Sequence, residues 1–175
     1  MAVKTIKKSA ISHTPELTTP AMTGLVEKIR VGNATARRAA QILVEKQLGF
    51  TLPTPKQKKN IVVAFVKRDM IVYGRAFDII KLLAPVELDD LSEVEEKINM
   101  IQLFEIKSTN KDKISDNFRG YFFGLTAAEV LVAQSLKQQF KFALVNTLTK
   151  HHIELSLSEL FGRAKGIYPT WSILF

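Results

Sequence analysis

Glu105 and Lys107 lie two positions apart near the polar end of an apolar segment over residues 101–109. The segment is predicted to be a buried strand, in which residues i and i+2 point to the same face. Glu105 and Lys107 should therefore project together. Because burying unpaired charge is costly, an apolar strand rarely carries two charged side chains on one face. The pattern indicates a functional site.

Asp78 is the predicted partner of this pair. If the segments over 76–83 and 98–107 form an antiparallel hairpin, joined by the acidic stretch over 87–97, Asp78 lies beside Glu105. Two carboxylates at one place bind a divalent cation through hard oxygen ligands, and the carbonyl of Ile106 could add another. Lys107 would then orient or activate a water and offset charge on a phosphate. These groups together suit the hydrolysis of a phosphodiester.

An aspartate followed at a distance by Glu-x-Lys on an apolar strand resembles the PD-(D/E)xK nuclease superfamily, which includes restriction endonucleases, Holliday-junction resolvases and some homing endonucleases. The resemblance covers roughly residues 32–146, and the segment over 123–129 also looks like the one after the catalytic lysine in several restriction-type members. It implies that Asp78 and Glu105 are metal ligands and that Lys107 is the catalytic lysine.

The sequence departs from this pattern at Phe77, where the family commonly has proline. Asp89 or Asp90 could take the role of Asp78 if the strands run differently. Some members add a glutamate from the leading helix, for which the candidates are Glu27 and Glu45. A second Glu-x-Lys occurs at Glu95-Glu96-Lys97, but its polar, acidic surroundings do not predict a buried strand.

The remaining pattern predicts one mixed α/β domain over residues 21–175 after an irregular N-terminal arm over 1–20. The resemblance implies that this domain is restriction-endonuclease-like, with a mixed central sheet flanked by helices. Extended segments are predicted at 61–66 (a central strand), 70–73, 76–83, 98–107, 121–123, 140–146 and 153–155. Helices are predicted within 22–49, from Thr126 to 139 and after Ser156, the last two from capping boxes. Loops are predicted at 51–60 and 110–117, and an exposed excursion at 87–97.

The composition excludes some classes of chemistry and of protein. The chain has 175 residues, no cysteine and a formal net charge of +8. The absence of cysteine excludes thiolate chemistry and disulfides. No apolar run is long enough to cross a bilayer and the N-terminus lacks the pattern of a secretory signal, so we expect a cytoplasmic protein that does not enter a membrane. The positive charge favours DNA or RNA as a partner, although a basic soluble protein would show the same balance.

Each candidate also has a purely structural interpretation. Glu105 and Lys107 could form a cross-strand salt bridge, and Asp78 could be an ordinary turn carboxylate. His151-His152 is expected in a solvated turn, and residues 121–123 are expected in the core rather than as a base-stacking platform. Basic side chains that could hold DNA phosphates or simply face solvent are Arg37, Arg38, Lys56, Lys58 and Lys59.

The sequence therefore predicts a Mg²⁺-dependent deoxyribonuclease of the restriction type, or a related defence or mobile-element nuclease, in which Mn²⁺ can replace Mg²⁺. Asp78 and Glu105 hold the metal and Lys107 assists catalysis. Cutting both strands would require a homodimer or a partner subunit. The alternatives are a catalytically inactive DNA- or protein-binding subunit on the same fold, and an enzyme that acts on RNA.

Overall fold

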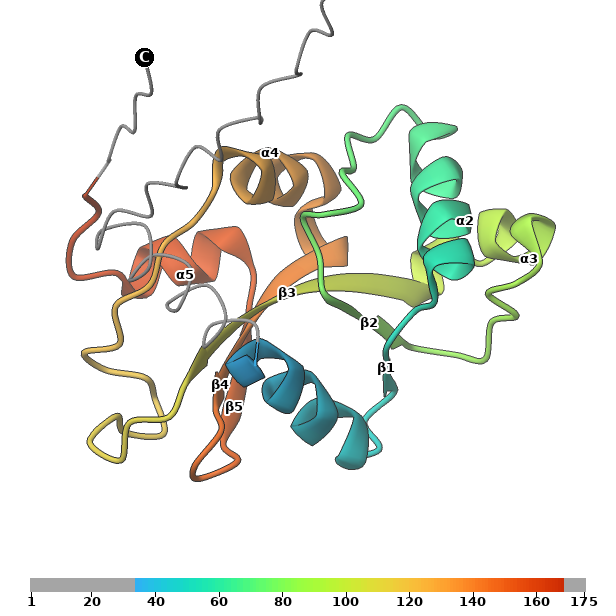
Figure 1. Cartoon of the computed structure of the whole chain (residues 1–175). Coiled ribbons are helices and arrows are strands. Elements are labelled where there is room, and N and C mark those ends of the chain that lie inside the picture. The colour runs from blue at the N-terminus through green and yellow to red at the C-terminus, as the bar shows by residue number, and fades with distance from the viewer. Residues whose placement is uncertain (1–33, 169–175) are drawn as a thin grey trace, which may run out of the picture. The chain divides into compact units, whose positions relative to one another are not determined.

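The structure, a computed structural model, describes residues 34–168 and is built on a five-stranded mixed sheet (Figure 1). The strands are β1 (Phe50–Thr51), β2 (Ile79–Leu82), β3 (Ile101–Thr109), β4 (Phe140–Asn146) and β5 (His152–Leu155), in the spatial order β1-β2-β3-β4-β5. Only the β3–β4 pair is parallel among these strands. The helix α4 (Ala127–Leu136) lies in the connection between them, as a parallel crossover requires. The predicted mixed α/β class is confirmed at this level.

The other helices are one over residues 34–45, α2 (Pro55–Val66), α3 (Leu91–Glu96) and α5 (Leu157–Arg163). Short 3₁₀ turns at Ile98–Met100 and Lys137–Gln139 lead into β3 and β4. The predicted N-terminal arm, the residues up to 33 and the apolar tail over 171–175 lie outside the described residues. Across residues 34–168, none of the helices combines the length and the apolar character that a membrane span needs.

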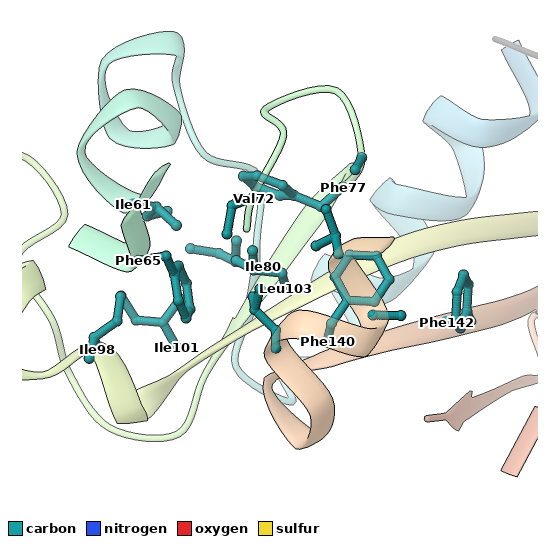
Figure 2. Close-up of a cluster of buried hydrophobic side chains, with 14 of the residues drawn as sticks. Ile61, Phe65, Val72, Phe77, Ile80, Ile98, Ile101, Leu103, Phe140 and Phe142 are labelled. Carbon is teal, nitrogen blue, oxygen red and sulfur yellow. The ribbon is translucent and has the colours of Figure 1, made fainter. Parts of the chain in front are cut away.

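The two faces of the sheet carry separate hydrophobic clusters. The helix over 34–45 packs Ala39 and Leu43 against Phe104 and Ile106 of β3 on one face. On the other face, Leu103 of β3 belongs to the larger cluster that includes buried residues of α2, α4 and α5. Figure 2 shows part of this larger cluster, including aromatic side chains from α2 and β4. The alternation along β3 fixes the face on which each of its side chains lies.

The predicted hairpin around the candidate site is confirmed. The strands β2 and β3 are antiparallel, with Ile79 opposite Phe104. The strand over 140–146 and both capping boxes are also as predicted, since Thr126 and Ser156 each cap a helix and donate a return bond from their backbone N–H to the glutamate three residues on. These elements follow from local patterns, because a capping box and a short run of aromatic and aliphatic residues each act within a few positions.

The central strand predicted at 61–66 is wrong, because these residues form the second half of α2. Thr54 begins this helix with a capping box to Gln57, and Pro55 occupies its first turn, where its missing N–H costs nothing. The buried residues of α2 are Ile61, Ala64 and Phe65, a spacing of three and four that belongs to a helix. The same helix replaces most of the loop predicted at 51–60.

Three further expectations are corrected. Residues 70–73 and 121–123 form no strand. Within residues 70–73, the backbone N–H of Ile71 donates to the hydroxyl of Ser135 in α4. A side chain of α4, rather than a neighbouring strand, therefore satisfies this N–H. The acidic stretch over 87–97 contains α3, which Asp90 caps and whose Val94 is fully buried. It is therefore a packed connection rather than an exposed excursion.

Candidate functional site

Glu105 and Lys107 project together from β3, on the face that α4 covers. They alternate with Phe104 and Ile106, which pack on the opposite face against the helix over 34–45. The Lys107 ammonium donates to Glu105 Oε1 at 2.9 Å, and both side chains are largely buried. The predicted pair is therefore brought together inside the protein rather than on an edge strand, because β3 lies between β2 and β4.

Asp78 is held beside this pair by the backbone of β3. Its N–H donates to the carbonyl of Phe104 at 2.8 Å, and the N–H of Ile106 donates to Asp78 Oδ2 at 3.0 Å. These bonds continue the antiparallel ladder one residue beyond β2 and place the carboxylate next to Glu105. The structure thus brings together the three side chains that the sequence selected.

A fourth group, Glu129 of α4, completes the arrangement and was not among the predicted site residues. Its Oε2 accepts from the N–H of Thr126 at 3.1 Å, which is the return bond of the capping box, and from Lys107 Nζ at 2.8 Å. Glu129 is buried. The capping box was visible in the sequence, but only the packing of α4 on β3 shows that the same carboxylate reaches Lys107. Asp78, Glu105, Lys107 and Glu129 are called the carboxylate cluster below.

The carboxylate cluster is electrostatically unbalanced. It sets three acidic groups against one ammonium. Burial raises the pKa of the Glu105 carboxyl, the negative charge of Asp78 raises it further, and the pull of Lys107 is too small to reverse this, so that the pKa reaches about 8. Burial lowers the pKa of Lys107, but Glu105 and Glu129 outweigh it and the net shift is upward. Lys107 is therefore a stable ammonium, and Glu105 holds a proton near neutral pH.

Glu154 of β5 offers an internal comparison. It also bonds a lysine, with Lys81 Nζ 2.8 Å from its Oε1, yet its pKa is lowered to about 2. A bond from His152 and the charges of Lys81 and Lys141 cause the decrease and exceed the effect of burial. Both glutamates bond a lysine, so the lysine bond does not explain why their pKa values differ. Glu154 has cations around it, whereas Glu105 has carboxylates around it.

The alternative acidic candidates have other roles. Asp89 binds Lys56 and Gln57 at the start of α2, and Asp90 caps α3. Glu45 is exposed at the end of its helix, and Glu27 lies outside the described residues. In the second Glu-x-Lys segment, Glu95 forms an ion pair with Lys67. Among the described residues, the acid beside Glu105 on the strand side is therefore Asp78.

The basic candidates divide between the two sides of the sheet. Arg37 and Arg38 are exposed on the helix over 34–45, which covers the face opposite Glu105. Lys58 of α2 lies on the side of the cluster, where its ammonium donates to the carbonyl of Phe77 at 2.9 Å and sits 4.7 Å from the centre of the Phe77 ring. Lys58 thereby fixes the residue that precedes Asp78.

Two lysines and the histidine pair remain among the candidates. Lys56 and Lys59 are exposed. His152 is half-buried at the start of β5, with its Nδ1 2.8 Å from Lys46 Nζ, and so does not lie in the expected solvated turn.

The carboxylate cluster offers oxygen donors of the kind that a hard divalent cation binds. Within residues 34–168 no three acidic or histidine side chains are arranged to hold an ion by themselves. Mg²⁺ commonly binds through one or two carboxylates and keeps the rest of its shell for water and substrate phosphate oxygens. Asp78 and Glu105 can supply such a pair, and a cation there would offset the excess negative charge.

Comparisons of this chain with protein-family models, with curated proteins and with solved structures found no match. The resemblance to the PD-(D/E)xK superfamily therefore stays a prediction from the residues of the site.

The contrast between Glu105 and Glu154 predicts opposite effects of the same substitution. A carboxyl whose pKa is raised on folding stabilises the protein below its unfolded pKa, near 4.5, and loses that contribution as the pH rises through about 8. In the absence of divalent cations, wild type should therefore lose stability relative to Glu105→Gln as the pH rises from 5 to 9. The difference in unfolding free energy between the variant and wild type, measured by urea denaturation, should increase over this range.

Glu154→Gln is the matched control. A pKa lowered to about 2 gives a contribution that is complete above about 4.5 and is lost only in acid, so this variant should be less stable than wild type throughout the same range. If Glu105→Gln were destabilised in parallel with Glu154→Gln, Glu105 would be an ordinary salt-bridge partner.

Proposed function

We propose that this protein is a Mg²⁺-dependent endonuclease that hydrolyses DNA phosphodiester bonds at the carboxylate cluster. The observation that carries the proposal is the environment of Glu105, where burial and the charge of Asp78 oppose ionisation of the carboxyl more strongly than Lys107 favours it. Such an arrangement costs stability and is common where an acid is needed for binding or catalysis. Without a cation, the ionised form of Glu105 is unfavourable. A bound cation would offset this negative charge, so the same arrangement would favour cation binding.

The order of elements supports a restriction-endonuclease-like fold. An antiparallel run of β1, β2 and β3 is followed by α4 and by β4, which is parallel to β3. Asp78 immediately precedes β2, and Glu105 and Lys107 are on β3. This is the relation between the acid and the Glu-x-Lys segment that the resemblance implies.

Asp78 and Glu105 would hold the divalent cation. When bound, Mg²⁺ or Mn²⁺ would neutralise charge on the phosphate and lower the pKa of a coordinated water. The bond from the Ile106 N–H to Asp78 Oδ2 holds that carboxylate in place before a cation arrives. Glu105 must lose its proton to become a ligand, so binding should tighten as the pH rises.

Lys107 acts as a charged donor in this proposal rather than as a base. Its pKa is raised, so it keeps its proton and cannot take one from water at neutral pH. Its ammonium can donate to a phosphate oxygen as negative charge develops there. Glu129 orients Lys107 from α4, where the capping bond to Thr126 fixes the carboxylate.

The net charge of +8 supports DNA as the substrate. Cutting a duplex requires two sites, which a homodimer or a partner subunit would supply. One observation favours the second candidate, a non-catalytic subunit of a DNA-processing assembly: Lys107 already bonds two carboxylates, as in a closed structural ion network.

Plasmid cleavage distinguishes the two candidates. Wild type should nick or linearise supercoiled DNA with Mg²⁺ or Mn²⁺, and EDTA should abolish this cleavage. Glu105→Gln should reduce the cleavage rate by about a hundredfold or more, because it removes a charged ligand. Lys107→Ala is a less clean variant, since it would leave Glu105 and Glu129 buried without their cation. The matched control is Glu95→Gln in the second Glu-x-Lys segment, which should cleave like wild type.

A folded wild-type protein that binds DNA and never cleaves it with either metal would instead support the non-catalytic subunit. Equal cleavage by wild type and Glu105→Gln would contradict the assigned site.

Glu129 can be tested against a second capping-box glutamate. Glu159 makes the same return bond, to Ser156, at the start of α5, but it is exposed to solvent. Glu129→Gln and Glu159→Gln should therefore perturb their caps similarly, while only Glu129→Gln should lower kcat, by about tenfold, with little change in KM. Single-turnover cleavage of a labelled duplex measures this difference. Equal kcat values for the two variants would show that Glu129 serves only as a cap.

A further inference from the structure

Phe122 is an exposed aromatic residue between two packed ones. Its exposed fraction is 81%, the highest among the exposed large hydrophobic residues in the described part of the chain. Tyr121 and Phe123 on either side are half-buried and pack against the larger core cluster. The expectation that residues 121–123 belong to the core therefore holds for the outer two residues and is wrong for Phe122.

The neighbours of Phe122 hold it outward. The hydroxyl of Tyr121 donates to the carbonyl of Ser108 at 2.6 Å, and the rings of Tyr121 and Phe123 lie 5.2 Å apart. Burial raises the pKa of Tyr121 to about 12, so the hydroxyl keeps the proton that it donates. With both flanking side chains fixed in the core, the intervening ring is directed to solvent.

The segment that presents Phe122 is tied to the carboxylate cluster on both sides. Ser108, which receives the bond from Tyr121, follows Lys107 directly in β3. Thr126, four residues after Phe122, donates its N–H to the same Glu129 oxygen that binds Lys107. The exposed ring therefore belongs to a short segment that two bonds fix relative to the site.

The preceding loop carries a modest positive excess. Residues 110–120 contain three basic and two acidic side chains, and all five are exposed. The basic ones are Lys111, Lys113 and Arg119. Proteins that hold single-stranded nucleic acid combine basic side chains, which contact the backbone phosphates, with exposed aromatic rings, on which bases stack.

We propose that Phe122 stacks on an unpaired base of the DNA substrate beside the carboxylate cluster. The proposal rests on the function proposed above and extends it to the form of the substrate. A phenyl ring has no hydrogen-bonding group, so it distinguishes exposed from paired bases but does not read their identity. The chain would then favour DNA with a single-stranded or bulged segment at the cleavage site over a continuous duplex.

Binding is measured by fluorescence anisotropy in EDTA, so that no cleavage occurs. The probes are a labelled 20-nucleotide single strand, the matching duplex, the same duplex with a three-nucleotide bulge, and an RNA strand of the same sequence. Phe122→Ala should bind the single strand and the bulged duplex about tenfold more weakly than wild type, with duplex affinity changed less than about twofold. Phe122→Trp should restore binding.

Phe161→Ala is the matched control, because Phe161 is a phenylalanine of α5 with an exposed fraction of 41%. It should bind all four probes like wild type. A 2-aminopurine in the bulge should change its fluorescence on binding wild type and not on binding Phe122→Ala.

Equal losses on duplex and single strand, or no loss with Phe122→Ala, would overturn the stacking role. A greater effect on the RNA strand would overturn the choice of DNA. A lower melting temperature or a changed oligomeric state for Phe122→Ala, with unchanged binding, would show that another protein surface covers the ring. Plasmid cleavage by the same preparations separates these results from the proposed function, since wild type that neither binds nor cleaves DNA would overturn both.

Discussion

The burial of Glu105 against Asp78, with Lys107 as the only ammonium in the carboxylate cluster, is the constraint on which the account depends. A buried carboxylate needs compensation, and this cluster provides less positive charge than it needs. The protein meets the constraint in part by keeping a proton on Glu105. In the proposed function, the same imbalance would favour a divalent cation, because a cation would replace that proton.

The sheet makes this arrangement possible by separating two electrostatic environments. Glu105 and Lys107 lie on the face that α4 covers, whereas Phe104 and Ile106 of the same strand pack against the helix over 34–45. Glu154 of β5 sits among cations, and its pKa falls to about 2. Two strand glutamates in one small protein thus have pKa values on opposite sides of neutrality. The difference comes from burial and the charge of Asp78 at Glu105, and from the bond of His152 and the nearby lysines at Glu154, rather than from the presence of a lysine partner.

Much of the site followed from local sequence rules. The two-residue period of a strand places Glu105 with Lys107, and the antiparallel hairpin places Asp78 beside them. Glu129 did not follow in the same way, because its contact with Lys107 depends on how α4 packs on β3, which the pairing of strands does not specify. The capping box predicts where the helix begins, but it does not predict how the helix is oriented on the sheet.

The main error in the fold has a similar origin. Residues 61–66 have the composition of a strand, yet the helix start at Thr54-Pro55 and the three-and-four spacing of Ile61, Ala64 and Phe65 prevail. A β-branched run is compatible with a helix whose apolar side has a core to pack against, so tertiary burial decided the outcome. Phe122 was misjudged for the converse reason, since its type suggests burial and only the anchoring of its neighbours shows that it is exposed.

Calorimetric titration of wild type with Mg²⁺ or Mn²⁺ near pH 7, in two buffers of different ionisation enthalpy, tests the central claim most directly. If a cation replaces the proton on Glu105, binding should release up to about one proton per site, and the observed enthalpy should differ between the buffers in proportion. Glu105→Gln should bind neither metal. Binding without proton release, or equal binding by Glu105→Gln, would contradict the claim that this carboxyl exchanges its proton for a metal ion.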